Sequence, residues 1–294
     1  MVEAGIVLVD KPGGMTSYDV VARARKAFGT RKIGHAGTLD PMATGLLVLG
    51  IEGATRLLTF IVGLDKTYEA TIRLGVSTDS DDADGESTAS MDASALTDGA
   101  IASAMAPLTG LISQVPSSVS AIRVNGRRAY DLARAGEQVE LAARSVEVSR
   151  FDVVAVRRAG EAVDLDVVVD CSSGTYIRAL ARDLGGALGV GGHLTALRRT
   201  RIGPFDLDGA VGVDGLAEAS VFSPARAAAL VLGRFDVSAD EARDLRHGKR
   251  LVGAAPRLAT GVAAIDPEGA LVGIVEKRGT DVKSAMNMPT GAGA

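Results

Sequence analysis

The chain has 294 residues, 47% of them hydrophobic and 23% charged, which is close to the average for soluble globular proteins. Its formal net charge of −4 argues against a simple nucleic-acid binder. No apolar run approaches the roughly 18 residues of a membrane span, and no basic-then-apolar leader is present, so we expect a cytoplasmic protein. The single cysteine, Cys171, excludes an intramolecular disulfide, and three widely separated histidines predict no metal site.

Charge is distributed unevenly along the chain. Residues 77–98 hold seven acidic residues and no base, whereas residues 11–37 hold six bases against one acid. Residues 171–205 hold five bases against one acid. A third basic stretch contains Arg123, Arg127, Arg128 and Arg134. Each stretch alone is typical of a solvated face, but together they favour a polyanionic partner, which needs only a local positive surface.

The N-terminal part of the chain predicts two buried strands and one helix. Apolar runs at Ile6–Val9 and Leu46–Ile51 are typical of buried strands. Between them, Thr16 and Asp19 have the spacing of a capping box and predict the start of a helix. The apolar face of this helix is expected to comprise Val20, Val21, Ala24, Ala27 and Phe28.

The middle of the chain predicts further strands and a second helix. Alternation over Thr67–Leu74 predicts a strand with Tyr68 on its apolar face, and strands are expected again at Phe151–Val156 and Val163–Val169. Residues 77–99, rich in Ser, Thr, Asp and Gly, are expected to form a mobile acidic loop or insertion. A helix after Gly174 is expected to bury Ile177, Leu180, Ala181 and Leu184.

The C-terminal part predicts a small α+β module beyond a boundary near Gly233. Ser238 and Glu241 have capping-box spacing, and Gly248 is a suitable stop for that helix. A hairpin is expected from apolar runs at Val262–Ile265 and Leu271–Glu276, joined by the turn sequence DPEG.

The most unusual segment is GHAGTLDPMATG, from Gly34 to Gly45, immediately before an apolar strand. Its glycines permit close approach of the backbone to a ligand, and Pro41 restricts Asp40 to an extended conformation. A rigid loop that presents one carboxylate suits nucleophilic or base catalysis. The spacing alone equally allows Asp40 to cap a turn before Pro41.

Other catalytic motifs are absent from the sequence. It contains no phosphate-binding G-x-x-x-x-G-K-[ST], no H-E-x-x-H and no G-x-S-x-G. The glycines at 189–192 do not have the spacing of a dinucleotide-binding loop. No histidine lies near Cys171 in the sequence, so we interpret this residue as strand packing.

Several further motifs accompany the Asp40 loop in a fixed order. They are Lys11-Pro12, DKTYEA at residues 65–70, VPS at 115–117, GTYIRAL at 174–180 and LRR at 197–199. With them, the chain from Ile6 to Phe205 closely resembles the TruB family of pseudouridine synthases. The tail resembles the family's small PUA-type RNA-binding module only in size and place.

The resemblance implies an α/β (α+β) fold. It comprises a catalytic domain over residues 1–233, with a central mixed, largely antiparallel sheet flanked by helices, and a PUA-like module over residues 234–294. The implied reaction isomerises the T-loop uridine of tRNA, conventionally position 55, to pseudouridine. The ribose–N1 bond breaks, the flipped uracil turns, and C5 reattaches to the same sugar carbon. This chemistry needs no cofactor, and the implied partner is the tRNA T-arm, with no membrane and no obligate protein partner.

The resemblance also assigns roles to single residues. Asp40 matches the catalytic aspartate, which either attacks the sugar carbon or removes the neighbouring 2′ proton. Tyr68 matches the tyrosine that stacks on the flipped uracil and assists proton removal at C5, and Arg178 matches the arginine paired with the catalytic carboxylate. The remaining substrate-binding residues are Tyr176 and Leu197, which line the pocket, His35, which inserts among the loop bases, and Lys11, which supports the active-site loop and is a candidate for RNA contact.

Two other functions remain open from the sequence. A guide-RNA-dependent relative shares these motifs, but it often carries long Lys-rich extensions that this sequence lacks. A non-catalytic RNA-binding protein has no use for a paired buried carboxylate, so the presence of Asp40, Tyr68 and Arg178 together disfavours it.

Overall fold

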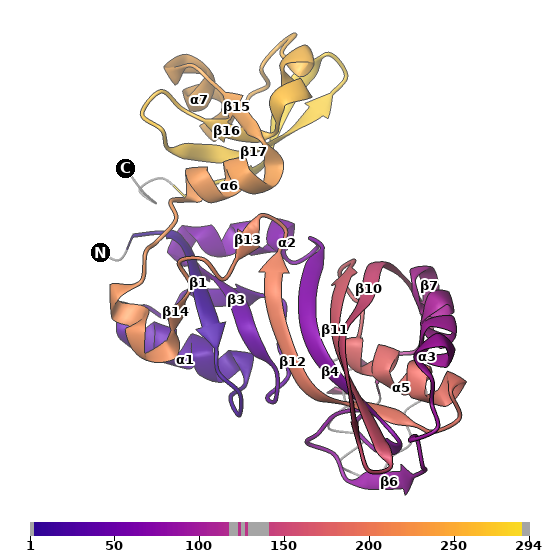
Figure 1. Ribbon diagram of the computed structural model, residues 1–294. Helices are drawn as coiled ribbons and strands as arrows, with labels where there is room; N and C mark the ends of the chain where they lie inside the picture. The colour runs from indigo at the N-terminus through magenta and orange to yellow at the C-terminus, as the bar shows by residue number, and fades with distance from the viewer. Residues whose placement is uncertain (1–2, 118–122, 125–126, 129–140, 290–294) are drawn as a thin grey trace. The chain divides into compact units, whose positions relative to one another are not determined.

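The computed structural model describes residues 3–117, 123–124, 127–128 and 141–289, and the chain divides into two compact units (Figure 1). The first unit comprises residues 1–41, 45–63 and 202–294, and the second comprises residues 42–44 and 64–201. Each unit combines a sheet with flanking helices, which confirms the predicted mixed α/β class.

The first unit contains a small mixed sheet with strand order β14-β1-β3 and with β2 beside β3. β1 runs parallel to β14 and antiparallel to β3, and β2 runs antiparallel to β3. The fully buried Val7, Val9, Leu47 and Leu49 of this sheet pack with Val20 of the first helix. The elements are β1 (Gly5–Lys11), α1 (Ser17–Phe28), β2 (Ile33–Ala36), β3 (Thr44–Ile51), α2 (Leu58–Ile61), β13 (Phe205–Asp206) and β14 (Val211–Gly212), with short 3₁₀ turns at Glu52–Leu57 and Val213–Glu218.

The capping box predicted for α1 is present. The Thr16 hydroxyl accepts the Asp19 N–H at 3.1 Å, and the Asp19 carboxylate accepts the Thr16 N–H at 2.9 Å. The helix ends at Gly29, which has φ 64° and so adopts the left-handed conformation that glycine tolerates. Val20, Val21 and Ala24 are buried as predicted, whereas Ala27, in the last turn, is exposed.

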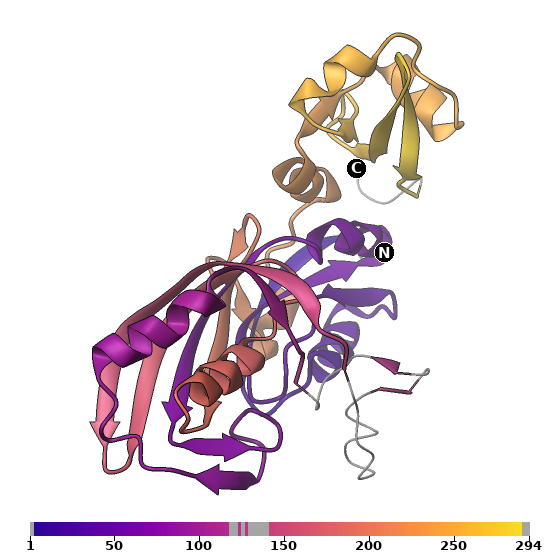
Figure 2. The same cartoon turned by 90° about the vertical axis from the view of Figure 1, so that its right-hand side faces the viewer.

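The second unit contains a sheet with strand order β12-β4-β11-β10-β7, in which the pairs β4–β11, β11–β10 and β10–β7 are antiparallel. Helix α5, the salmon helix of Figure 2, packs against β4 and α3. Strict alternation buries one face of β4 and β11, so Tyr68 lies opposite Val169 in the core. The elements are β4 (Lys66–Leu74), α3 (Asp98–Met105), β7 (Gly110–Gln114), β8 (Arg123–Val124), β9 (Arg127–Arg128), β10 (Arg144–Ala159), β11 (Ala162–Cys171), α5 (Ile177–Ala187) and β12 (Gly192–Ile202), with a 3₁₀ turn at Ala106–Leu108.

The acidic segment of the second unit is ordered by specific contacts. β5 (Val76–Thr78) and β6 (Ser87–Ser90) form an antiparallel hairpin. Within the intervening turn, Ser80, Asp81 and Asp82 are buried, with 4–9% of their surface exposed. The expectation of a mobile acidic loop is therefore wrong for this part, because composition alone does not reveal that arginines elsewhere in the chain neutralise the carboxylates.

The C-terminal residues of the first unit form a separate four-stranded sheet with order β15-β16-β17-β18. The predicted hairpin is confirmed as the antiparallel pair β16–β17, and the capping box of Ser238 and Glu241 is confirmed at the start of α7. The proposed domain boundary near Gly233 stays a prediction. The elements are α6 (Pro224–Leu232), β15 (Arg234–Asp236), α7 (Ala239–Arg246), β16 (Ala263–Ile265), β17 (Leu271–Arg278) and β18 (Asp281–Asn287), with a 3₁₀ turn at Ala255–Thr260.

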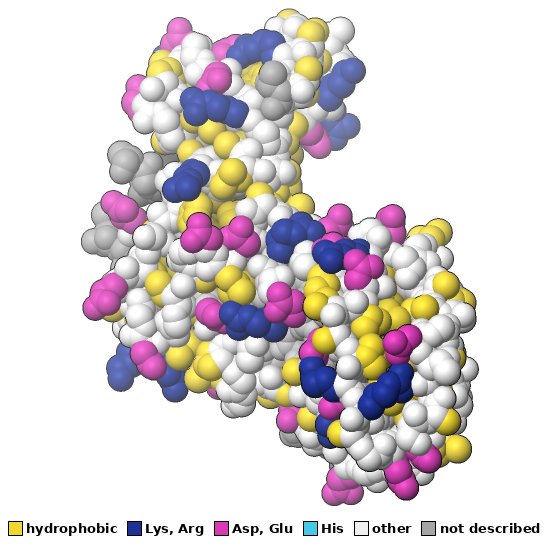
Figure 3. Space-filling view, viewed as in Figure 1, with side chains coloured by type: hydrophobic (Ala, Val, Ile, Leu, Met, Phe, Trp, Pro, Cys, Tyr) yellow, Lys and Arg dark blue, Asp and Glu magenta, His cyan; other side chains and the backbone are white. Residues whose placement is uncertain are grey.

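The surface seen in Figure 3 carries Lys and Arg side chains interspersed with Asp and Glu side chains. Among the described residues, many charged side chains form ion pairs, as in Arg73–Asp164 at 2.7 Å and Arg158–Asp98 at 2.7 Å. Among the residues that the structure describes, no helix is both long enough and apolar enough to cross a membrane.

Candidate active site

The loop that carries Asp40 connects β2 to β3 and is anchored on both sides of this residue. On the C-terminal side, the Pro41 carbonyl oxygen accepts the Gly14 N–H at 2.8 Å and the Lys11 ammonium at 3.3 Å. On the N-terminal side, the buried Leu39 is held by Ser17. Asp40 itself is half-buried. The backbone of the loop is therefore fixed on both sides of a half-buried aspartate.

Lys11 is completely buried, at 0% exposure. Its Nζ donates to the carbonyl oxygens of Pro12 at 2.9 Å, Met15 at 2.6 Å and Pro41 at 3.3 Å. A direct contact between this ammonium and RNA, one of the sequence expectations, does not fit such burial. The geometry gives Lys11 a supporting position instead, because its ammonium joins the backbone of the segment between β1 and α1, at Pro12 and Met15, to Pro41 of the Asp40 loop.

Ser17 joins α1 to the same loop through two hydrogen bonds. Its hydroxyl accepts the Leu39 N–H at 2.8 Å and donates to the Leu39 carbonyl oxygen at 3.2 Å. The side chain is buried, so water cannot replace it at low cost.

We expect Ser17→Ala to lower the free energy of unfolding by about 2 kcal/mol, because both Leu39 groups lose a buried partner. Urea unfolding of the two proteins measures this difference. Ser220→Ala, the same change at an exposed position, should shift stability by less than about 0.5 kcal/mol. Equal midpoints for Ser17→Ala and the parent protein would show that Ser17 does not brace the loop.

The second unit holds the other predicted site residues. Tyr68 on β4 is 8% exposed and Leu197 on β12 is 7% exposed. Tyr176 precedes α5, and Gln114 holds its backbone from both sides: the Gln114 side chain accepts the Tyr176 N–H at 2.8 Å and donates to the Tyr176 carbonyl oxygen at 3.1 Å. His35 lies in the first unit, half-buried on β2 and opposite Leu49 of β3. Within each unit, the candidate residues are thus fixed on regular elements or on their ends.

Arg178 lies in the first turn of α5 and is buried, with 4% of its side chain exposed. Its Nη1 donates to the Ser80 carbonyl oxygen at 2.9 Å and lies 3.2 Å from Asp82 Oδ2, whose side chain is 6% exposed. A permanently charged guanidinium suits a buried position of this kind because its planar donors can satisfy several acceptors at once. The structure thus adds Asp82 to the residues around Arg178.

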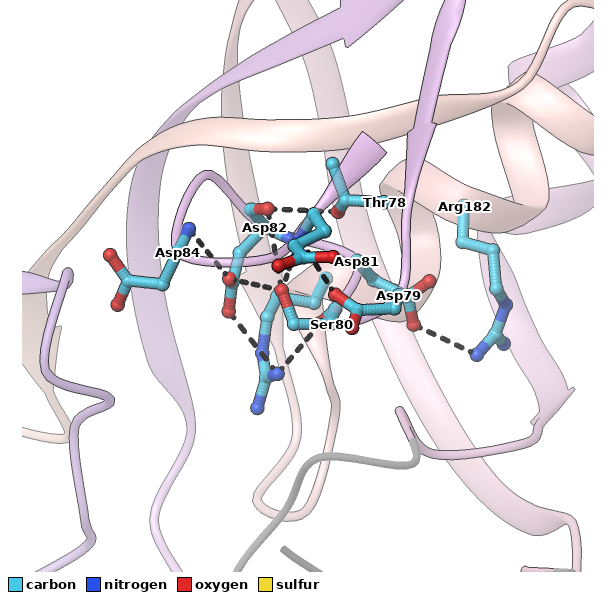
Figure 4. Close-up of polar contacts among 9 residues, drawn as sticks. Thr78, Asp79, Ser80, Asp81, Asp82, Asp84 and Arg182 are labelled. Atoms are coloured by element: carbon cyan, nitrogen blue, oxygen red, sulfur yellow. Dashed lines mark hydrogen bonds and ion pairs between the residues drawn. The ribbon is translucent and has the colours of Figure 1, made fainter. Parts of the chain in front are cut away.

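Asp82 is held by its own turn (Figure 4). Its carboxylate accepts the Ser80 hydroxyl at 2.6 Å and the Asp84 N–H at 3.1 Å, and its carbonyl oxygen accepts the Thr78 hydroxyl at 2.8 Å. No motif in the sequence singled out Asp82. The available signal was the run of carboxylates without a base at 77–98, which requires cations from elsewhere in the chain if it is buried.

A second buried basic group lies next to Tyr68 on β4. Lys66 is 5% exposed, and Arg199 of β12 is 1% exposed. Burial and the neighbouring Arg199 lower the pKa of Lys66 to about 8. Cys171, opposite Lys66 in the strand register, has its pKa raised to about 11 by burial. This thiol is therefore protonated at neutral pH, which fits strand packing rather than nucleophilic chemistry.

Three arginines of the basic stretch at 171–205 form ion pairs with carboxylates of the protein itself. Arg178 pairs with Asp82, Arg182 with Asp81, and Arg201 lies 3.6 Å from Asp170. Arg178 is therefore too deeply buried to offer a positive surface, whereas Arg182 and Arg201 keep 33% and 39% of their side chains exposed. In the stretch at 11–37, exposed bases include Lys26, Arg31 and Lys32. The third stretch lies outside the described residues: the side chains of Arg123, Arg127 and Arg128 and all of Arg134.

The comparisons with known proteins agree in one family. Three family models match: "TruB family pseudouridylate synthase (N terminal domain)" over residues 25–177, "tRNA pseudouridylate synthase B C-terminal domain" over 178–235, and "tRNA Pseudouridine synthase II, C terminal" over 225–289. A relative from Arthrobacter sp. (strain FB24), named tRNA pseudouridine synthase B, is 57% identical over 293 residues, which cover 96% of each chain. One of the same name from Mycolicibacterium paratuberculosis (strain ATCC BAA-968 / K-10) is 55% identical over 284 residues, again 96% of each chain.

Solved structures share the fold at lower identity. One, titled "Structure of H/ACA RNP bound to a substrate RNA containing 2'-deoxyuridine", matches with a TM-score of 0.71 and 23% identity and covers 100% of this chain and 88% of the other. Another, titled "Crystal structure of the archaeal box H/ACA sRNP Nop10-Cbf5 complex", matches with a TM-score of 0.70 and 22% identity and covers 99% of this chain and 88% of the other. The solved structures support the fold, and the family models and the relatives more than half identical in sequence show that the chain belongs to the TruB family of pseudouridine synthases, which are isomerases.

Proposed function

We propose that the protein converts the T-loop uridine of tRNA, at position 55, to pseudouridine without a cofactor. The proposal is supported by relatives that are 57% and 55% identical over 96% of the chain and carry the name tRNA pseudouridine synthase B. The observation that carries it is the anchored Asp40 loop, in which both neighbours of a half-buried aspartate are held by buried side chains. Such fixation is what a reacting group requires.

In this proposal, Asp40, Tyr68 and Arg178 are the catalytic residues. Asp40 either attacks the sugar carbon or removes the neighbouring 2′ proton, and either route breaks the bond between that sugar carbon and N1, so that uracil leaves the ribose. Tyr68 stacks on the flipped base and assists proton removal at C5 after reattachment. Arg178 grips the catalytic carboxylate, and the contacts with Ser80 and Asp82 hold its guanidinium in place.

Three of the remaining residues bind the substrate: Tyr176 and Leu197 line the base pocket, and His35 inserts among the loop bases. Lys11 supports the Asp40 loop through its bond to Pro41. Because the C5 edge of uracil is inaccessible while the base is stacked, the nucleotide must flip at a cost of a few kcal/mol. Stacking and phosphate contacts offset this cost. We assign residues 234–294 to a PUA-like RNA-binding module and place the reaction in the cytoplasm.

An assay with purified components tests the proposal. The protein is incubated with an unmodified tRNA transcript, without any other protein or guide RNA, and pseudouridine is mapped along the product. We expect conversion of one uridine at position 55, and none in a transcript that carries cytidine there. Conversion only after addition of a guide RNA and partner proteins would favour the guide-dependent function. Tight binding without conversion would favour a non-catalytic RNA-binding protein.

Binding to tRNA should weaken steeply as salt rises, because phosphate neutralisation releases counterions. We expect a triple variant with Lys26, Arg31 and Lys32 changed to Gln to reduce the slope of log affinity against log salt by about 2 units. Filter binding or anisotropy over a salt series measures this slope.

The matched control replaces three arginines that are paired with Asp164, Asp166 and Asp98, namely Arg73, Arg157 and Arg158. It should leave the slope nearly unchanged. If the triple variant of Lys26, Arg31 and Lys32 has the same slope as the parent protein, these bases do not contact the phosphates of tRNA.

A further inference from the structure

We propose that Arg182 is a positioning residue for the reaction: it pairs with the Asp81 carboxylate, so that Arg178 is not drawn away from Asp82. This inference rests on the proposed function and adds a residue to it. It assigns a role to the second arginine of α5, which lies one helical turn beyond Arg178.

The geometry of α5 brings both arginines to the acidic turn between β5 and β6. Residues four positions apart lie on one face of a helix, so Arg178 and Arg182 project side by side. Arg178 reaches Ser80 and Asp82, whereas Arg182 Nη1 lies 3.2 Å from Asp81 Oδ2. Figure 4 shows Arg182 extending to the edge of the acidic turn.

Arg182 is fixed by two further contacts. Its Nε donates to Asp183 Oδ1 at 2.9 Å, and its Nη2 donates to the Val115 carbonyl oxygen at 2.7 Å. The guanidinium thus has acceptors on three sides and a defined orientation. Lysine, with a single ammonium, cannot reproduce all of these contacts.

Asp81 lies between the two groups that bind Arg178. Its φ of 61° is in the left-handed region, which Asp tolerates better than most residues. Its carbonyl oxygen accepts the Leu194 N–H at 3.0 Å. Because Ser80 and Asp82 flank Asp81 in the chain, any movement of Asp81 shifts both acceptors of Arg178.

The charges of both Arg182 and Arg178 act on the buried Asp81 carboxylate. Burial raises the pKa of Asp81, while the Ser117 hydroxyl and then the charges of Arg182 and Arg178 lower it; Asp183 raises it further. Two guanidinium groups therefore stabilise one buried carboxylate. If Arg182 is removed, Arg178 is the remaining arginine of α5 close to Asp81, and an unpaired buried carboxylate attracts it strongly.

The test compares Arg182→Met, Asp81→Asn and the double variant in single-turnover assays on tRNA. We expect Arg182→Met to slow pseudouridine formation by about tenfold or more, as a small displacement of a reacting group does. The dissociation constant for tRNA should change less than about threefold, because protein acceptors already engage the Arg182 guanidinium on three sides. Asp81→Asn alone should be milder, since Asn also tolerates the left-handed conformation.

The decisive result is the double variant. Asp81→Asn removes the competing charge, so adding it to Arg182→Met should restore most of the lost rate, a positive coupling that loss of packing would not produce. A double variant as slow as Arg182→Met would overturn the inference. Arg243→Met on α7, where the lost partner Asp240 is exposed, serves as a matched control and should show neither effect.

A readout that is independent of turnover separates this inference from the proposed function. The Nε–H resonance of Arg178, identified by its loss in Arg178→Lys, should shift in Arg182→Met and return in the double variant. A resonance unmoved by Arg182→Met would refute the positioning role even in an active enzyme. A protein that shows the shift and its reversal but does not modify tRNA would refute the proposed function alone.

Discussion

Asp40→Asn is expected to slow single-turnover pseudouridine formation by at least about 10⁴. The substitution keeps the shape of the side chain but removes the negative charge. A neutral amide can neither attack the sugar carbon nor remove the 2′ proton, so both mechanistic routes fail. The surrounding anchors on Leu39 and Pro41 are backbone contacts and do not depend on the carboxylate. The loop itself should therefore remain in place.

Enzyme in excess over tRNA isolates the chemical step from product release, and pseudouridine is then quantified against time. The affinity for tRNA should change by less than about tenfold, because phosphate contacts and stacking do not involve Asp40. Asp208→Asn provides the same change at an exposed position and should retain the parent rate. If folded Asp40→Asn protein converts uridine at a comparable rate, Asp40 is not the catalytic residue.

Arg178→Lys should reduce the single-turnover rate by about 10² or more, although the charge is kept. In the structure, one guanidinium contacts both the Ser80 carbonyl oxygen and the Asp82 carboxylate while almost fully buried. An ammonium is a compact point charge that cannot hold these acceptors and orient a catalytic carboxylate in one plane. We therefore expect a large effect on the rate and a smaller one on the dissociation constant for tRNA.

Thermal unfolding of the same variant separates chemistry from stability. A moderate fall in the melting temperature is expected, because the buried Asp82 would be less well compensated. Arg243→Lys on α7 is the matched comparison, because Arg243 and its partner Asp240 are both exposed, and it should leave the melting temperature nearly unchanged. If Arg178→Lys turns over at nearly the parent rate, Arg178 has no role in the reaction.

The sequence predicted the elements whose signals are local. The capping boxes that start α1 and α7 depend on residues three positions apart, and the apolar stripe of α5 repeats within three turns. The alternation of β4 likewise lies within nine residues. The Asp40 loop could be identified from the sequence because glycine frees the backbone and proline restricts the residue before it, wherever they occur.

The features that the sequence did not predict depend on distant partners. Asp82 and Arg178 are far apart in the chain, and the polar composition around Asp82 is equally typical of a solvated loop. Composition cannot show whether a carboxylate is paired. The 16 residues of β10 (Arg144–Ala159) were predicted only in part, since most of them are exposed and charged residues interrupt the apolar pattern. Lys11 is visible in the sequence as a cation, but its burial depends on contacts with Met15 and with the distant Pro41.

The burial of Lys11 links the Asp40 loop to the folding of the sheet. Lys11 is the last residue of β1 and lies opposite Gly45 of β3, so its ammonium reaches Pro41 only when these two strands are paired. Gly14 contributes a second bond to the same carbonyl oxygen. The loop therefore cannot acquire its final form before long-range strand pairing. It should also open together with the strands rather than alone, which gives the Leu39 amide slow hydrogen exchange for a loop position.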